Sequence, residues 1–298
     1  MTTKPFSGSY SVDDVEFLLK VIDVPALDIT EKERRIQQQT AHYSEVISKE
    51  SPPSPQYMDL YRSALAENGA RMAADVLALA AHLNQVHGAG QPIVLTSLAR
   101  AGTPVGVLLK RTLATVFKRE VFHYSVSIIR DRGIDENAMA YILARHPDTA
   151  IAFIDGWTGK GVITQELEKN ISALNAKHNL NIDKELYVLS DLAGVAGYAP
   201  SFEDYLIPSS ILNATVSGLV SRTILSTQYI GPADFHGCLY YQQFEDIDLS
   251  VQFVDAIFAH VLEARVPETA PTGEGKLFAN KTNSAFLADM LERTGLTN

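Results

Sequence analysis

The stretch Ala150-Ile-Ala-Phe-Ile-Asp-Gly-Trp-Thr-Gly-Lys-Gly-Val162 decides the fold, because an apolar run passes into a glycine-rich turn and then a helical pattern. Its first five residues are apolar, which predicts a strand buried on both faces of a sheet. Further strands are predicted at 93–97, 120–129 and 186–190, with helices at 104–116, 135–145 and 162–177 between them. Such alternation predicts a Rossmann-like open, mostly parallel α/β sheet with helices on both faces.

The segments outside this alternation divide the chain into three parts. We expect residues 1–60 to form an N-terminal arm, with a short helix or turn at 15–22. The run Ser51-Pro-Pro-Ser-Pro55 breaks the chain before a helical pattern at 58–87. Residues 61–265 would form the α/β domain, with a hood at 193–241 over the strand ends. Residues 266–298 would form a C-terminal linker and helix.

Composition excludes several classes of protein. The 298 residues carry a net charge of −10, which disfavours non-specific nucleic-acid binding and docking on an anionic membrane. The single cysteine, Cys238, excludes an intrachain disulfide and fits a reducing compartment. No run reaches the length of a membrane helix, and the first residues lack the apolar core of a signal peptide. We therefore expect a cytoplasmic protein with no membrane partner.

The turn after residue 154 is predicted to hold an anion. Asp155 ends the strand, and a helix opens near Gly161, where backbone N–H groups and the helix dipole attract negative charge. Thr158 adds a hydroxyl and Lys160 adds a positive charge. The turn is not a nucleotide P-loop, because Ile154 replaces its first glycine and Gly161 replaces its serine or threonine.

Other residues near strand ends are predicted to join this site. A pyrophosphate loop is expected at Arg100, Ala101 and Gly102, and a flexible loop at Arg130, Asp131 and Arg132. Plain turns and solvated loops are the alternatives. The possible pocket wall comprises His123, Asp191, Ser221 and Arg222. Asp191 has two interpretations, a turn cap or a contact to magnesium through water.

The turn resembles the diphosphate-sugar loop of type I phosphoribosyltransferases, in which a strand leads into acids and then a Thr-Gly pair. Gly156 stands where that loop has a second acid, and the spacer is about one residue short. The resemblance implies binding of 5-phosphoribosyl 1-diphosphate, or a related ribose phosphate, with Mg²⁺ near Asp155 and Asp191. The ligand residues implied are Asp155, Gly156, Thr158, Gly159, Lys160 and Gly161.

Several segments together resemble a phosphoribosyltransferase-like family linked to bacterial tellurium-resistance and stress operons. Some of its members carry the label cysteine protease StiP. The resemblance implies transfer of phosphoribosyl to or from an unknown base, a sugar-phosphate or nucleotide partner, and allows a homo-oligomer. The matching segments are Gly8-Ser-Tyr10, His42-Tyr-Ser-Glu45, Ser97-Leu-Ala-Arg-Ala-Gly-Thr-Pro104, residues 123–135, Asp155-Gly-Trp-Thr-Gly-Lys-Gly161 and Ser217-Gly-Leu-Val-Ser-Arg-Thr223.

Two alternatives to transferase function stay open. The first is a cysteine protease that uses Cys238, which follows His236 by two residues. A thiol nucleophile needs a base, but a lone cysteine is more commonly a small buried hydrophobe. The second is a non-catalytic protein that binds a nucleotide or sugar phosphate in stress response, favoured by Gly156. The segment His42-Tyr-Ser-Glu45 would be a lid, a contact on the nucleobase side, or merely structural.

Overall fold

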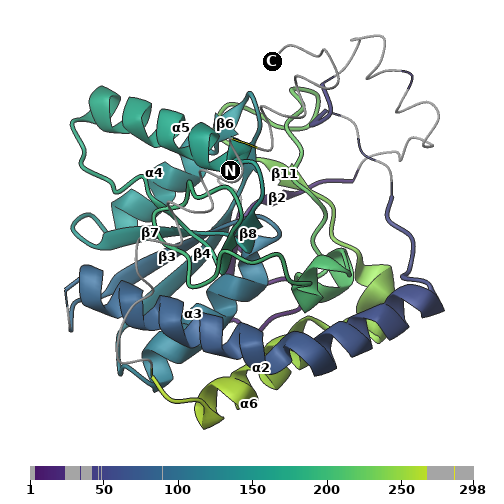
Figure 1. Cartoon of the computed structure of the whole chain (residues 1–298). Helices are drawn as coiled ribbons and strands as arrows, with labels where there is room; N and C mark the ends of the chain where they lie inside the picture. Colours follow the sequence, from purple (N-terminus) through teal and green to yellow (C-terminus); the bar gives the residue numbers. More distant parts are fainter. Residues whose placement is uncertain are drawn as a thin grey trace.

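The computed structural model describes residues 4–23, 42–45, 47, 49–88 and 90–266, together with Arg34 and Ala285. A five-stranded sheet of order β1-β4-β3-β7-β9 lies at its centre (Figure 1). All four neighbouring pairs are parallel, as predicted. The C-terminal prediction at 266–298 lies outside the described residues, apart from 266 and 285. In sheet order the strands are Glu16–Leu18, Val121–Val126, Ile93–Leu98, Ala150–Ile154 and Leu186–Tyr187.

Helices cover both faces of the sheet, which confirms the predicted α/β class. One side carries α2 (Pro55–Val86), α3 (Gly102–Thr115) and α6 (Ser250–Glu263), and the other carries α4 (Glu136–Arg145) and α5 (Val162–His178) (Figure 1). Each side has its own apolar core. Met72 and Phe253 belong to the first core, and Met139 and Ile171 to the second.

Two helices begin where side chains satisfy their first free N–H groups. Ser54 caps α2, because its hydroxyl accepts a hydrogen bond from the backbone of Tyr57 at 3.4 Å. The next residue, Pro55, needs no hydrogen-bond partner there. The proline run that predicts a break therefore also starts the helix. Asp135 caps α4 in the same way, through the backbone N–H groups of Asn137 and Ala138.

The predicted helix or turn at 15–22 is wrong. This segment forms β1, which pairs with β4 at the edge of the central sheet, and β2 (Lys20–Val21), which pairs with β11 (Gly237–Cys238). A short apolar run fits a strand and a buried helical turn equally well. The strand expected at 186–190 also divides. Its second part, β10 (Ser190–Asp191), pairs with β8 (Trp157–Thr158) outside the central sheet.

Residues 193–247 form loops and short elements, and several of them pack in a third apolar cluster. Leu219, Ile224 and Tyr241 belong to this cluster. A small hairpin, β5 (Ile128–Ile129) with β6 (Gly133–Ile134), projects beyond β4. No described helix has both the length and the apolar character that crossing a bilayer requires. The short helical turns are η1 (Pro208–Ser210), η2 (Ala214–Val216) and η3 (Gln242–Ile247).

Candidate functional site at the strand ends

Two loops touch at the carboxyl ends of β3 and β7. A Cβ atom added at Gly102 would overlap the carbonyl oxygen of Ile154, and one at Gly156 would lie 3.7 Å from the carbonyl oxygen of Ala101. Glycine is therefore required at position 102 for this approach. The contact places the predicted pyrophosphate loop beside the predicted diphosphate-sugar loop, at the edge of the sheet where open α/β folds bind ligands.

A cavity of about 210 Å³ opens where these loops meet the region after residue 193. Its walls are partly apolar, from Pro104, Ile207 and Leu212, and partly hydroxyl-bearing. Gly156 and Trp157 are the residues that the β7–β8 turn contributes. The remaining lining residues are Arg100, Ala101, Ser209, Ser210, Asn213 and Ser217. Residues between 207 and 217 thus form one side of this cavity.

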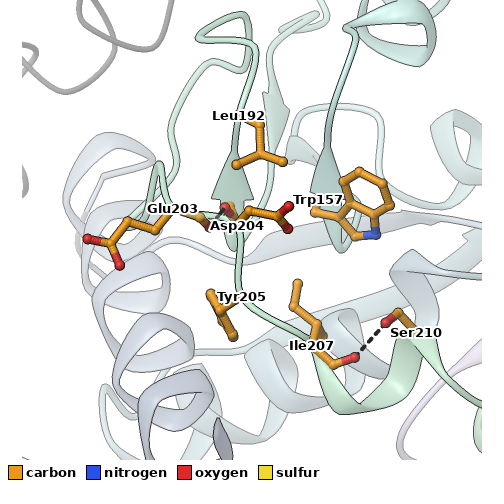
Figure 2. A pocket seen from close by; sticks show the side chains of 8 residues that line it. Trp157, Leu192, Glu203, Asp204, Tyr205, Ile207 and Ser210 are labelled. Carbon is orange, nitrogen blue, oxygen red and sulfur yellow. Dashed lines mark hydrogen bonds between the residues drawn. The ribbon is translucent and has the colours of Figure 1, made fainter. Parts of the chain in front are cut away.

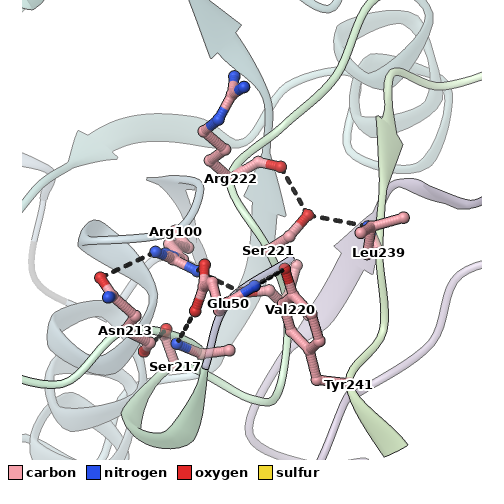
Figure 3. Close-up of polar contacts among 10 residues, drawn as sticks. Glu50, Arg100, Asn213, Ser217, Val220, Ser221, Arg222, Leu239 and Tyr241 are labelled. Atoms are coloured by element: carbon pink, nitrogen blue, oxygen red, sulfur yellow. Dashed lines mark hydrogen bonds and ion pairs between the residues drawn. The ribbon is translucent and has the colours of Figure 1, made fainter. Parts of the chain in front are cut away.

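Arg100 is held by three acceptors in this cavity wall (Figure 3). Its guanidinium donates to the carboxylate of Glu50, to the carbonyl oxygen of Val220 at 3.1 Å, and to the side chain of Asn213 at 3.0 Å. The side chains of Arg100 and Glu50 are each only 17% exposed. A protein carboxylate therefore occupies the place at this guanidinium that an anionic ligand would need.

Glu50 is itself fixed on both sides of this ion pair. Its second carboxylate oxygen accepts the backbone N–H of Ala214 at 3.0 Å, and its own N–H donates to the hydroxyl of Tyr241 at 3.2 Å. Sequence patterns missed this residue, because it lies 50 positions before Arg100 on a segment without periodicity. The local sequence shows only that Glu50 lies just before the proline run. That position does not indicate which residue its carboxylate pairs with.

The turn from Asp155 to Gly161 is hydrogen-bonded both within itself and to residues 187–192. The hydroxyl of Thr158 accepts the N–H of Gly161 at 3.2 Å, and Thr158 is buried. The indole of Trp157 covers Gly159, because a Cβ there would lie 2.7 Å from the ring. Lys160 is exposed. The turn thus lies at the expected edge of the sheet, but its hydroxyl already has a partner. The phosphate contact assigned to these residues stays a prediction.

Asp155 has an unusual electrostatic environment. One carboxylate oxygen accepts the N–H of the adjacent Gly156 at 2.8 Å, and its backbone N–H donates to the carbonyl of Tyr187 at 3.0 Å. Burial raises the pKa of Asp155 to about 7, and the single N–H only partly offsets this effect. The carboxyl group can therefore gain or lose a proton near neutral pH.

The expected magnesium ligands do not gather into a metal site. Asp191 is buried, and its two carboxylate oxygens accept backbone N–H groups from residues 193, 194 and 196 at 3.2, 2.8 and 2.7 Å. This contact pattern is that of a turn cap. Across the part of the chain that is described, no group of three or more His, Cys, Asp or Glu side chains is placed to hold a metal. Magnesium stays a prediction.

The predicted flexible loop lies at the tip of the β5–β6 hairpin and contacts the N-terminal arm. The side chain of Arg132 donates to Glu45 at 3.1 Å, and the backbone of Arg130 donates to the hydroxyl of Tyr43 at 2.9 Å. The N–H of Asp131 donates to Glu166 at 3.1 Å. The arm segment 42–50 thus contacts this loop at one end and, through Glu50, Arg100 at the other.

His123 of the predicted pocket wall is a buried structural group. Its Nδ1–H donates to the carbonyl oxygen of Asp14 at 2.8 Å, so its Nε2 accepts the hydroxyl of Ser97 at 2.8 Å. Burial lowers the pKa of His123 to about 3, which keeps the ring neutral. A Cβ at Gly106 of α3 would overlap both side chains, so the helix covers the pair completely.

Ser221 and Arg222 lie beside the Arg100 cluster (Figure 3). The hydroxyl of Ser221 donates to the carbonyl oxygen of Arg222 at 2.7 Å and accepts the N–H of Leu239 at 2.8 Å. The guanidinium of Arg222 lies 5.9 Å from the ring centre of Tyr43. Ser221 therefore joins the strand-end cluster to the strand that contains Cys238, while Arg222 faces the arm.

Cys238 is fully buried in β11, opposite Val21 of β2. Burial raises the pKa of its thiol far above the ordinary value, and no charged group of the described residues offsets the effect. His236 is also buried, which lowers its pKa, and its Nδ1 bonds to the hydroxyl of Ser127 at 2.8 Å. In this conformation the thiol is protonated and shielded from solvent.

Comparison with known proteins identifies relatives of this chain. A family model described as "Tellurite-like stress resistance cysteine protease StiP" matches residues 8–258. A protein of Acinetobacter baylyi named "Cysteine protease StiP" is 42% identical over 260 residues, which make up 85% of this chain and 67% of that protein.

These comparisons correct the predicted function. Both names describe a cysteine protease, and neither describes transfer of a phosphoribosyl group. The prediction of a phosphoribosyltransferase is therefore wrong, although the expectation of an enzyme agrees with the relative's name. The expected link to tellurite-like stress resistance is confirmed. The physical reason for the error is that a strand, a glycine-rich turn and a helix specify a fold and not a reaction.

Proposed function

The chain belongs to the StiP family of tellurite-like stress resistance proteins, and from this premise we propose that it is a thiol peptidase that uses Cys238. The observation that carries the proposal is the cysteine count. The sequence has one cysteine, and it lies inside the matched residues 8–258. Any thiol nucleophile of this chain must therefore be Cys238.

The geometry gives this proposal a specific form, in which the described conformation is a latent one. A thiolate is the attacking species, and burial of Cys238 suppresses it. His236, two residues away, is the nearest histidine in sequence; burial lowers its pKa, and its Nδ1 bonds to the hydroxyl of Ser127. Peptidase action requires that β2 separates from β11, so that solvent, substrate and a base reach the thiol.

A peptide-hydrolysis assay tests the proposal directly. Wild type and Cys238→Ala are incubated with a fluorescently quenched casein, and thiol alkylation by iodoacetamide is followed in parallel. We expect Cys238→Ala to lower hydrolysis at least about a hundredfold, as loss of a covalent nucleophile does. Ser226→Ala, at a partly exposed position outside both β2 and β11, serves as the control and should hydrolyse at the wild-type rate. Equal hydrolysis by wild type and Cys238→Ala would exclude a thiol mechanism.

A second candidate is a non-catalytic protein that binds a nucleotide or sugar phosphate during stress. The specific observation in its favour is the buried thiol together with the cavity beside Arg100. An anion would have to displace Glu50 from Arg100. Calorimetry with AMP and with ribose 5-phosphate should then show tighter binding to Glu50→Gln than to wild type. Absence of heat from both proteins would remove this candidate.

A further inference from the structure

A second cavity adjoins the strand-end cavity and contains no residue that the proposed thiol chemistry uses (Figure 2). It encloses about 90 Å³. It shares Trp157, Ile207 and Ser210 with the strand-end cavity, so the two cavities adjoin at these residues. Its other lining residues are Ser190, Leu192, Glu203, Asp204 and Tyr205.

The wall around Glu203 and Tyr205 is fixed by contacts to its neighbours. The hydroxyl of Ser190 donates to the carbonyl oxygen of Glu203 at 2.8 Å, and the hydroxyl of Tyr205 donates to Asp75 at 2.8 Å. Arg71 pairs with the carboxylate of Glu203 at 2.8 Å and lies 4.1 Å from the ring centre of Tyr205. The cavity therefore has its shape before any ligand arrives, which lowers the entropic cost of binding.

The charge in this cavity is negative and is not fully compensated. Arg71 offsets Glu203, whereas Asp204 is exposed and forms no ion pair within the described part of the chain. Figure 2 shows the carboxylate of Asp204 directed toward Trp157. The indole is 49% exposed, and the face of an indole attracts cations. A carboxylate and an indole that line one small cavity favour the same kind of ligand, an organic cation.

We propose that the cavity between Trp157 and Asp204 binds the alkylammonium or guanidinium group of a peptide substrate. The assignment of that cation to a peptide rests on the proposed function. The cationic head lies between the carboxylate and the indole, and the adjoining peptide follows the strand-end cavity past Ile207 and Ser210. Cleavage then favours sequences with lysine or arginine at one subsite.

The chain provides its own reporter for this test, because Trp157 is its single tryptophan. The fluorescence of the full chain is titrated with N-acetyl-lysine amide and N-acetyl-arginine amide, and with neutral N-acetyl-glutamine amide as the control ligand. We expect a saturable change with the two cations alone, weaker at high ionic strength. Trp157→Phe should abolish the signal and so establishes its origin.

A charge-neutral substitution locates the site. Asp204→Asn should weaken binding of both cations about tenfold, as expected for loss of one charge-assisted contact. The matched control is Asp246→Asn, which removes the same charge from an exposed position of η3 outside this cavity. Circular dichroism checks that both variants fold. Equal responses to cationic and neutral ligands, or unchanged affinity in Asp204→Asn, would overturn the proposal.

This test fails separately from the test of the proposed function, because it measures binding without turnover. Cation binding that persists in Cys238→Ala supports the cavity as a site and is independent of thiol chemistry. Hydrolysis that depends on Cys238 but shows no cation binding would overturn the cavity proposal alone. Cation binding without any thiol-dependent hydrolysis would instead overturn the thiol peptidase.

Discussion

Arg100 and Cys238 lie in neighbouring parts of the fold, but they are restrained in opposite ways. The guanidinium of Arg100 is held by named polar partners, with Glu50 the charged one. The thiol of Cys238 is restrained by apolar packing, and burial alone sets the direction of its pKa shift. Ser221 connects the two regions through its contacts to Arg222 and Leu239.

This difference indicates what would have to change before the guanidinium of Arg100 or the thiol of Cys238 could contact a ligand or substrate. A charged group held by a carboxylate can exchange that partner for a ligand anion, with little change elsewhere. A thiol held by packing can ionise only if the strands that cover it separate. The first change is local and selective for ligand charge, and the second is a conformational opening with its own free energy. Three pairs of substitutions test how polar contacts and burial restrain these groups, from the largest expected effect to the smallest.

The largest effect is expected from Glu50→Gln. The amide removes the charge that balances Arg100, and its oxygen cannot serve both the guanidinium and the N–H of Ala214. We expect a loss of about 3 kcal/mol in the free energy of unfolding, as for removal of one partner of a largely buried pair. Urea unfolding measures it.

Glu45→Gln is the matched control for that change. Glu45 also pairs with an arginine, but the side chains of Arg132 and Glu45 are 45% and 36% exposed. Exposed pairs contribute little, so the loss should stay below about 0.5 kcal/mol. Equal losses in the two variants would show that burial does not strengthen the Glu50–Arg100 pair.

An intermediate effect is expected from Asp155→Asn, and it depends on pH. Because the folded-state pKa of Asp155 is raised to about 7, its protonated form favours folding at low pH, and that contribution is lost as pH rises through 7. Asparagine does not ionise, so the variant does not lose stability in this way as pH rises. It should be more stable than wild type at pH 8 by about 2 kcal/mol, a value reduced for partial exposure, and should lose the advantage at pH 5.

Asp191→Asn provides the contrast for Asp155, because three backbone N–H groups bind the carboxylate of Asp191. That variant should be destabilised at both pH values. Thermal unfolding at pH 5 and pH 8 measures the stability of each of the two variants relative to wild type at each pH. A stability difference for Asp155→Asn that does not change with pH would contradict the raised pKa of this carboxyl group.

The smallest effect separates Cys238→Ser from Cys238→Ala. Serine places a hydroxyl in an apolar site, where it lacks a partner among the described residues. We therefore expect Cys238→Ser to be less stable than Cys238→Ala by about 1 kcal/mol. If the serine variant instead matches wild type in stability, the thiol has access to water or to a polar partner, and the contrast with Arg100 is lost.

Much of the fold follows from local sequence patterns. The apolar runs at 93–97 and 150–154 predict β3 and β7 correctly, because central parallel strands are buried on both faces. The edge strand β1 has no such signature. It has three residues and begins with Glu16, and its identity depends on β4, which lies about a hundred residues later.

The candidate site was less predictable, for physical reasons. The turn at Asp155 and the loop at Arg100 were both placed at the correct strand ends, because parallel strands bring their carboxyl ends to one edge. The partner of Arg100 was missed, because ion pairs between distant irregular segments leave no periodic pattern. The reaction was also predicted wrongly. Backbone geometry at a strand end does not specify chemistry, and the chemistry of Cys238 depends on packing that composition does not show.

The position of β1 has a consequence for biosynthesis. Glu16 pairs with Tyr124, and Lys20 of the following strand pairs with Gly237. During synthesis β1 therefore has no neighbour in the central sheet until β4 has been made, and β2 has no partner strand until β11 has been made. Such non-local pairing slows folding and leaves apolar residues such as Phe17 and Leu18 uncovered in the nascent chain. A chaperone that binds short apolar segments would find a binding site here.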